Sequence, residues 1–554
     1  MIKDYTVLPL DAFAKFAKEQ PNNIYLRQPI DGHYNETTWA EAYQKVLRLA
    51  AGYRSLGLEV GDKVAILSEN CAEWFISDFA LTAVGLISVP IYFTAGEKTI
   101  SYVLEHSEAK AIVVGKLGDA SAAKAAIPDD FLSIGMPYDS VPCKVQLTQL
   151  IDDNEPLVDL HKPQVDDMFS IAYTSGSTGN PKGVVLTFRN IIFGANSMYD
   201  EIDKPDKESV ISYLPLAHIT ERALIQYASL YNGGMVTFNE SLATFVRDLK
   251  SANVTAFLSV PRLWMKFQAG VLAKMPQKKL DRLLKIPVVK GLVKKKIKEQ
   301  LGLSNTRICG SGSAPIAPSI LEWYQKLGIE IAEGWGMTEL TGMATSQFPF
   351  RADKLGTIGK TVDGLQIKIS DEGEILIRGD AVFKEYYKDP ATTAETFTED
   401  GWMLTGDRAS IDTDGYFRIT GRVKELFKSG KGKYVAPVPI ESLMVQNQLI
   451  DQICVMGSGL AKPMAVLVLA PETSAGLSRE AISASLAETL DLVNQQLEKH
   501  ECLGGLCIAK ETWAVENGML TPTLKIKRDV LEGKYQGLIT HESGDKVIWE
   551  KSFA

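Results

Sequence analysis

The sequence predicts an α/β protein, and two observations in its first third point to that class. Short apolar runs typical of strands, at 63–67, 86–91 and 111–114, alternate with helical patterns at 72–84 and 99–106. Strands that alternate with helices pair in parallel through crossover connections. Because each of these strands is apolar without interruption, we expect helices on both faces of the sheet. The expected fold is a large N-terminal domain of parallel or mixed sheets layered with helices.

A change in the sequence near residue 420 marks the end of that domain. A turn at 412–415 and a strand at 416–420 lead into a polar break at 421–424, and a glycine-rich loop follows at 429–433. The residues that remain are enough for one further compact domain. We therefore expect an N-terminal domain over 1–421 and a small α+β C-terminal domain over 422–554.

Composition excludes several functional classes. The 554 residues are 45% hydrophobic, typical of a globular protein, and the net charge of −9 argues against a general nucleic-acid-binding protein. The six cysteines lack metal-binding spacing and are typical of reduced core residues. No signal peptide is apparent, and no apolar run reaches the ~18 residues of a membrane span. We expect a cytoplasmic protein, at most peripheral at the inner face of a membrane.

Residues 278–298 differ from the rest of this acidic chain. Nine lysine or arginine side chains alternate there with nine apolar ones. A basic amphipathic segment of this kind can lie on an anionic membrane surface. The alternative is a solvated helical face on which the lysine stems cover apolar surface.

Residues 173–183, Tyr-Thr-Ser-Gly-Ser-Thr-Gly-Asn-Pro-Lys-Gly, predict a phosphate-binding loop. Glycines let backbone N–H groups approach an anion, hydroxyls add donors, and a lysine supplies a point charge. The loop lies between the apolar runs 169–173 and 184–186, so we expect a turn between two strands. It is not a Walker loop, because proline precedes the lysine and glycine follows it. The alternative is a polar surface turn. The residues expected to bind phosphate are Thr174, Ser175, Gly176, Ser177, Thr178, Gly179 and Lys182.

This loop closely resembles that of the adenylate-forming (AMP-binding) superfamily, which includes acyl-CoA synthetases, luciferases and peptide-synthetase adenylation domains. Further matches extend from about residue 30 to about residue 530, and the resemblance is closest to long-chain fatty acid–CoA ligases. It implies that a carboxylate reacts with ATP and Mg²⁺ to give an acyl-adenylate, from which coenzyme A displaces AMP. It also implies that the C-terminal domain rotates about a hinge, here expected at Lys424, between the two half-reactions.

Residues 333–339, Glu-Gly-Trp-Gly-Met-Thr-Glu, resemble the family motif whose threonine touches phosphate and whose glutamate binds Mg²⁺. A carboxylate suits magnesium beside phosphates. Thr338 and Glu339 receive these roles. Relatives usually have tyrosine where this chain has tryptophan, and either ring can stack on adenine. The alternative is an aromatic-rich loop that caps a helix. The other nucleotide-binding residues expected in this motif are Gly334, Trp335 and Gly336.

Two further segments resemble nucleotide-binding motifs of the family. Residues 310–315, Gly-Ser-Gly-Ser-Ala-Pro, resemble the segment along adenine and precede a helix expected at 320–327. Alone they would indicate an ordinary turn. Residues 401–407 resemble the ribose-binding motif, in which an aspartate accepts both ribose hydroxyls; an ordinary strand and turn is the alternative. The residues implied are Gly312, Ser313 and Ala314 for adenine, and Asp407 and Arg422 for ribose.

Residues 520–528, Leu-Thr-Pro-Thr-Leu-Lys-Ile-Lys-Arg, resemble the segment that carries the family's catalytic lysine. A cation at the bridging oxygens favours the transition state of adenylation. Lys525 aligns best with that lysine, although many relatives have glycine where this chain has Leu524. Lys527 is the alternative catalytic residue, and a solvated basic face is the alternative structure.

The acyl site is implied by segments 213–222 and 260–264, which resemble the long-chain branch of the family. His218 is expected near the carboxylate as a further catalytic residue, and Trp264 is expected to line or gate the acyl tunnel. Outside such a motif, a histidine or a tryptophan is more often structural. Residues 429–437 are expected to border the pantetheine tunnel.

The resemblance implies an ATP-dependent ligase that joins a medium- or long-chain fatty acid to coenzyme A. Its expected partners are the fatty acid, ATP and coenzyme A, with no nucleic acid, a peripheral membrane contact through 278–298, and a homodimer compatible with the sequence. One alternative is a ligase that loads the acyl group onto a carrier protein, although no carrier domain is evident. Another is a catalytically inactive nucleotide- or lipid-binding protein.

Overall fold

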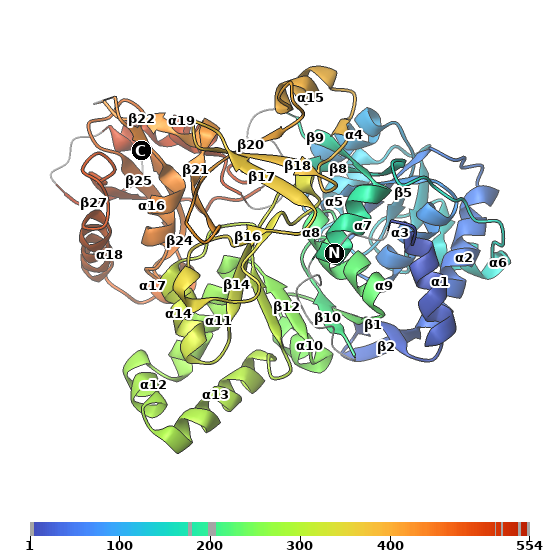
Figure 1. Ribbon diagram of the computed structural model, residues 1–554, viewed down its shortest axis with the longest axis horizontal. Coiled ribbons are helices and arrows are strands. Elements are labelled where there is room, and N and C mark those ends of the chain that lie inside the picture. The colour runs from blue at the N-terminus through green and yellow to red at the C-terminus, as the bar shows by residue number, and fades with distance from the viewer. Residues whose placement is uncertain are drawn as a thin grey trace.

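The computed structural model describes residues 5–174, 180–197, 207–430, 432–515, 517–521, 525–540 and 545–550. Helices and sheets are layered along the N-terminal part of the chain, and the C-terminal part lies to one side (Figure 1). This arrangement confirms the predicted α/β class.

An eight-stranded sheet contains the strands predicted from the first third of the sequence. Its central strands pair in parallel, and the two strands at one edge pair antiparallel. The strands, in spatial order, are β19 (Glu385–Tyr386), β9 (Lys182–Thr187), β8 (Met168–Thr174), β4 (Ile87–Ile91), β3 (Lys63–Leu67), β5 (Ala109–Val114), β6 (Leu132–Gly135) and β7 (Val145–Gln146).

Both faces of this sheet are buried, as the apolar strands predicted. Val64 and Ile66 point into one hydrophobic core, and Ala65 and Leu67, which alternate with them, point into another. The predicted helices at 72–84 and 99–106 are confirmed with small changes in their ends. The helices around the sheet are α2 (Trp39–Ser55), α3 (Ala72–Ala83), α4 (Glu97–Ser107), α5 (Ser121–Ala126) and α6 (Leu147–Asp153).

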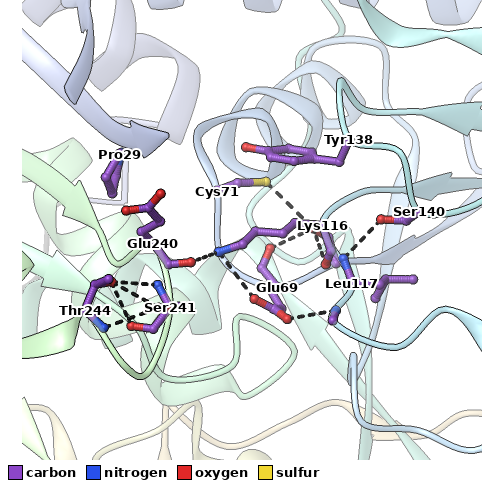
Figure 2. Close-up of polar contacts among 12 residues, drawn as sticks. Pro29, Glu69, Cys71, Lys116, Leu117, Tyr138, Ser140, Glu240, Ser241 and Thr244 are labelled. Atoms are coloured by element: carbon purple, nitrogen blue, oxygen red, sulfur yellow. Dashed lines mark hydrogen bonds and ion pairs between the residues drawn. The ribbon is translucent and has the colours of Figure 1, made fainter. Parts of the chain in front are cut away.

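A four-stranded sheet lies beside the first and is joined to it by Lys116 (Figure 2). Lys116 follows β5; its ammonium donates to the backbone oxygen of Glu240, which follows β11, and lies 3.4 Å from the carboxylate of Glu69. The elements of this region are β10 (Ser209–Ser212), β11 (Met235–Phe238), β1 (Ile24–Ile30), β2 (His33–Thr38), α1 (Pro9–Glu19), α7 (Phe188–Ser197) and α9 (Ala228–Asn232).

The third sheet is followed by the strands that lead toward the C-terminal part. It contains β12 (Ala256–Ser259), β13 (Ile308–Ser311), β14 (Ile331–Trp335), β15 (Thr345–Ser346) and β16 (Lys360–Thr361), and it packs with α10 (Phe245–Ala252), α11 (Pro261–Lys274) and α14 (Pro318–Lys326). A fourth sheet contains β17 (Leu365–Ile369), β18 (Glu374–Gly379), β20 (Met403–Ile411) and β21 (Phe417–Arg422), with α15 (Pro390–Thr396) nearby.

The basic segment 278–298 folds as two helices, α12 (Gln277–Leu284) and α13 (Pro287–Leu301). Pro287 starts the second helix, where its missing N–H costs no hydrogen bond. Both helices extend away from the sheets (Figure 1). Among the described residues, no helix has both the length and the apolar composition needed to cross a bilayer.

The polar break expected at 421–424 begins later than predicted. Gly421 and Arg422 still belong to β21, because they pair with Arg408 and Asp407, and the chain then turns through η4 (Val423–Glu425). The domain boundary at Gly421 stays a prediction.

Residues after this turn form cores of their own, which contain side chains from 435 to 539. Their elements are β22 (Phe427–Lys428), β23 (Tyr434–Val435), α16 (Pro437–Met444), β24 (Ile450–Met456), β25 (Met464–Leu469), α17 (Pro471–Ser474), α18 (Arg479–Asn494), β26 (Leu506–Ile508), α19 (Arg528–Ile539) and β27 (Val547–Trp549).

A fully buried ion pair connects the large sheet to the segment that contains His218. This segment forms a short turn, α8 (Ile219–Glu221), and a π-helix, η1 (Arg222–Tyr227). The Arg222 guanidinium donates to both carboxylate oxygens of Asp78 on α3, at 2.8 and 2.9 Å. It also donates to Ser170 on β8 and Ser88 on β4. One side chain therefore joins a helix, two strands and the π-helix.

We predict that Asp78→Asn strongly destabilises the protein, because it leaves the Arg222 charge buried without a counter-ion. Breaking a buried pair costs about 3–5 kcal/mol. The midpoint of urea unfolding should fall accordingly. Asp166→Asn is the matched control, since Asp166 pairs with Arg189 at 2.7 Å but is 70% exposed. That change should cost no more than about 1 kcal/mol. Equal midpoints for the two variants would contradict the prediction.

Candidate active site

The predicted phosphate loop connects two paired strands. Thr174 ends β8, Lys182 begins β9, and the two residues are partners in the antiparallel ladder. Ser175, Gly176, Ser177, Thr178 and Gly179 lie outside the described residues. The Lys182 ammonium lies 5.0 Å from the ring centre of Tyr386 on β19. The two predicted strands on either side of the loop are therefore confirmed, and Tyr386 lies beside Lys182.

Thr338 and Glu339 begin a short 3₁₀ turn, η2 (Thr338–Leu340), soon after β14 ends. The backbone folds back tightly here, because a Cβ built on Gly336 would lie 2.1 Å from the carbonyl oxygen of Gly342. Only glycine fits at that position. Glu339 is buried, and one of its oxygens accepts a hydrogen bond of 2.8 Å from the Tyr386 hydroxyl.

Tyr386 thus links the lysine of the phosphate loop to Glu339, and the sequence analysis did not identify it. No motif marked this residue. Its position depends on the pairing of β19 with β9, which are far apart in the sequence. The hydroxyl holds the carboxylate, and the ring packs against the lysine.

The Asp407 carboxylate is held from two sides. The indole N–H of Trp335 donates to one oxygen at 2.9 Å, and Nε of Arg422 donates to the other at 2.6 Å. A carboxylate has about four acceptor positions, so both oxygens can still accept hydroxyl donors. Three residues predicted from separate motifs therefore lie together. The hydrogen bond from the indole was not predicted.

Gly312, Ser313 and Ala314 follow β13 and lie next to β14. The Gly312 N–H donates to the Ser259 carbonyl at 3.2 Å, and Gly334 is its neighbour on β14, since a Cβ on Gly312 would lie 3.2 Å from the Gly334 oxygen. Ser313 has φ +66°, an uncommon left-handed conformation for a residue other than glycine. Ser313 and Ala314 are exposed, so the surface of this turn is open to a ligand.

His218 is a neutral ring close to Lys525. Its Nδ1 accepts the Thr220 N–H at 3.2 Å, which leaves the proton of the neutral ring on Nε2. Burial, and then the positive charge of Lys525, lower the pKa of His218 to about 4. The ring is therefore a hydrogen-bond donor through Nε2 at neutral pH.

Lys525 comes just before Ile526, which forms a β-bridge with Leu520, and its backbone N–H donates to the Thr521 hydroxyl. Residues 522–524 lie outside the described part of the chain. Burial among protein atoms and the charge of Arg422 lower the pKa of Lys525. The negative charges of Asp407, Glu339 and Glu425 oppose this shift. Lys527 instead caps the start of α19, and its N–H donates to the Met519 carbonyl.

Arg528, at the start of α19, connects the segment that carries Lys525 to the turn after β21. Its guanidinium donates to Glu441 on α16 at 2.7 Å and lies 3.6 Å from Glu425 in η4. Lys424, the predicted hinge residue, is exposed in the same turn. The position of Lys525 is therefore coupled to the conformation of the predicted hinge.

Trp264 is completely buried on α11. Its indole N–H donates to the Gly310 carbonyl on β13 at 3.2 Å, and its ring packs edge-on against Phe257 and Tyr324. It therefore contacts the strand that leads into the predicted adenine segment. Its predicted role as a lining or gate of an acyl tunnel stays a prediction.

A metal ion at this site would depend on few protein ligands. Among the described residues, no three His, Cys, Asp or Glu side chains gather so as to hold an ion. Glu339 would supply a single hard oxygen ligand. This fits magnesium, which is commonly held by one or two carboxylates together with phosphates and water.

Two family models match the chain. The model described as AMP-binding enzyme matches residues 13–387, and the model described as AMP-binding enzyme C-terminal domain matches residues 427–541. The long-chain-fatty-acid–CoA ligase FadD15 of Mycobacterium bovis is 32% identical, over 94% of each chain. The peroxisomal long chain acyl-CoA synthetase 7 of Arabidopsis thaliana is 30% identical, over 90% of this chain and 80% of that protein.

Solved structures have the same fold. The adenylation domain of a carboxylate reductase from Mycobacterium chelonae is 22% identical with a TM-score of 0.81, over 97% of this chain and 91% of that one. The o-succinylbenzoate CoA synthetase of Bacillus subtilis, in complex with its acyl-adenylate intermediate, is 21% identical with a TM-score of 0.74. The match covers 94% of this chain and 97% of that one. The family models, which match both parts of the chain, and the relatives that are at least 30% identical show that the chain belongs to the AMP-binding enzyme family.

Proposed function

We propose that this protein is an ATP-dependent acyl-CoA synthetase for a medium- or long-chain fatty acid. The observation that carries the proposal is the position of Lys525, whose charge acts on Asp407, Glu339 and His218 although it comes from the C-terminal part of the chain. The names of the relatives, which are long-chain fatty acid–CoA ligases and synthetases, support the choice of substrate.

In the first step, a carboxylate oxygen of the fatty acid attacks the α-phosphorus of ATP, and pyrophosphate leaves. Lys525 stabilises the negative charge that develops between the two reactants, which is the kind of electrostatic assistance that contributes most to such reactions. The Nε2–H of His218 orients the carboxylate. Asp407 and Arg422 hold the ribose, Trp335 fixes Asp407, and the segment 312–314 lies along adenine. Lys182 and the loop residues before it hold the leaving phosphates.

Magnesium, when bound to Glu339, would neutralise charge on the phosphates. Tyr386 orients that carboxylate. The residues present fit this ion, because a single carboxylate beside a phosphate site is a common arrangement for magnesium.

In the second step, the thiol sulfur of coenzyme A attacks the acyl carbonyl carbon, the thiol proton is lost, and AMP leaves. We propose that the C-terminal domain, from residue 422 onward, rotates about Lys424 before this step, so that Lys525 leaves the site and residues 429–437 border the pantetheine. Within that segment, Lys431 lies outside the described residues.

We predict that Lys525→Ala blocks the first step and spares the second. Loss of one stabilising charge should slow ATP–pyrophosphate exchange by about 100- to 1,000-fold. Thioester formation from supplied acyl-AMP and coenzyme A should stay within a few-fold of the unmodified protein. Lys527→Ala is the control and should leave both steps intact. Equal loss of both steps in Lys525→Ala, or the larger loss in Lys527→Ala, would reject the assigned role.

We predict that Tyr386→Phe raises the magnesium requirement. The variant keeps the ring beside Lys182 and removes the hydroxyl that holds Glu339. Loss of a hydrogen bond that orients a metal ligand typically weakens metal affinity about 10- to 100-fold. The Mg²⁺ concentration that gives half-maximal pyrophosphate exchange should therefore rise. Tyr387→Phe is the control, because the Tyr387 hydroxyl contacts the exposed Glu108 instead. If both variants need the same Mg²⁺ concentration, Tyr386 does not position the ligand.

We predict that His218 stays neutral, with its proton on Nε2, from pH 5.5 to pH 8. Its pKa of about 4 lies below the value of about 6.5 for an unperturbed histidine. As the pH falls from 6.5 toward 4, the unfolded chain takes up this proton first, so the contribution of His218 to stability is lost on acidification. Nitrogen-15 chemical shifts of the ring, assigned with His218→Gln, measure its protonation state and its tautomer. A titration midpoint near 6.5 would contradict the prediction.

An acyl-chain series tests the substrate and separates the alternatives. AMP release should depend on coenzyme A and be fastest with medium- or long-chain acids. An enzyme that loads a carrier protein would form acyl-AMP without acceleration by coenzyme A. An inactive binding protein would show no pyrophosphate exchange with any acid.

A further inference from the structure

The hairpin formed by α12 and α13 is strongly basic, although the rest of the chain is acidic. Residues 277–301, here called the basic hairpin, contain nine lysine or arginine residues and two acidic ones, a net charge of +7, whereas the whole chain carries −9. The remaining residues therefore carry −16. Figure 1 shows that the hairpin extends away from the sheets at one edge of the molecule.

The base of the basic hairpin is firmly packed. Leu280, Ile297 and Leu301 are buried in the same core as Trp264. The Trp323 indole N–H on α14 donates to the Gln277 side chain at 3.0 Å. The hairpin is therefore a fixed projection from the layer of helices that covers the third sheet.

The tip of the basic hairpin exposes apolar side chains. Ile286 is 45% exposed, Val288 80% and Leu292 66%. Val288 and Leu292 lie four residues apart on α13 and therefore share one face. Lys295 and Lys296 flank the same face of α13, and two further exposed lysines, Lys285 and Lys290, lie close in the sequence. Single exposed apolar residues are ordinary, but a group of them framed by like charges marks an interaction surface.

Few acidic side chains of the protein neutralise the positive charges of the lysines in the basic hairpin. Among the described residues they form one ion pair, between Lys295 and Glu299 at 3.9 Å. Burial, and then the charges of Lys290 and Lys298, lower the pKa of Lys294. An external anionic surface would relieve this repulsion.

We propose that the tip of the basic hairpin docks on an anionic phospholipid membrane. The lysines contact lipid phosphates, and Ile286, Val288 and Leu292 enter the boundary between headgroups and acyl chains. A nucleic acid would engage the lysines but would leave the apolar side chains in water, so the apolar tip favours a lipid surface. Given the proposed function, docking would bring the helices around Trp264 close to a source of fatty acid.

Flotation of the full chain with lipid vesicles tests this proposal, in the absence of ATP, fatty acid and coenzyme A. The protein should bind vesicles of phosphatidylcholine that contain phosphatidylglycerol, and binding should weaken with added salt and in pure phosphatidylcholine. Each lysine near an anionic membrane contributes about fivefold in affinity. The triple variant K290Q/K295Q/K296Q should therefore bind about 100-fold more weakly, and V288S/L292S should also bind more weakly.

The control K18Q/K98Q/K124Q changes net charge by the same amount at three exposed lysines on α1, α4 and α5. It should bind vesicles like the unmodified protein. Circular dichroism and pyrophosphate exchange should be unchanged in all variants, which separates docking from folding and from catalysis. No binding to anionic vesicles, or equal binding by the hairpin variant and the control, would overturn the proposal. So would tight binding to double-stranded DNA or to an acidic protein that V288S/L292S leaves unchanged.

Discussion

The buried ion pair between Asp78 and Arg222 is the constraint on which the candidate active site depends. The Arg222 guanidinium donates to Asp78 on α3, Ser88 on β4 and Ser170 on β8. Arg222 follows His218 by four residues, and Ser170 precedes the end of β8, at Thr174, by four residues. A charge inside the protein has no alternative partner in water, so these elements can separate only together. The end of β8, at Thr174, and the histidine are thereby held in one frame, although they come from different segments.

The cations around the proposed nucleotide come from three separate places in the fold. Lys182 begins β9, Arg422 ends β21, and Lys525 lies just before α19 in the C-terminal part. Two carboxylates, Glu339 and Asp407, lie among them and are already hydrogen-bonded through Tyr386, Trp335 and Arg422. A triphosphate brings four negative charges at most, and this arrangement offers it three cations from three parts of the fold.

Local features of the fold were predictable, and long-range ones were not. The strands at 63–67 and 111–114 and the two helices beside them follow from apolar periodicity, which a short segment contains completely. The resemblance assigned Asp407 and Arg422 to the same ribose site; the two side chains are hydrogen-bonded to each other, and their role at a ribose stays a prediction. Tyr386 was missed because its hydrogen bond to Glu339 requires β19 to pair with β9. The hydrogen bond from Trp335 to Asp407 was missed for the same reason, since it joins two different sheets. The break of the basic segment was signalled by Pro287, but the exposure of its tip depends on packing.

Few side chains connect the parts of the molecule before and after β21. Outside the site itself, the described residues form two hydrogen-bonded side-chain contacts of this kind, Arg262 with Asp451 and Ser319 with Gln446, and all four side chains are exposed. Exposed polar pairs each contribute about 0–1 kcal/mol. A ligand that prefers one orientation of the C-terminal part tenfold supplies about 1.4 kcal/mol. In the proposed rotation, the preference of the bound ligand would therefore rival the protein's own polar contacts in setting the orientation, so each product would select the orientation required for the next reactant.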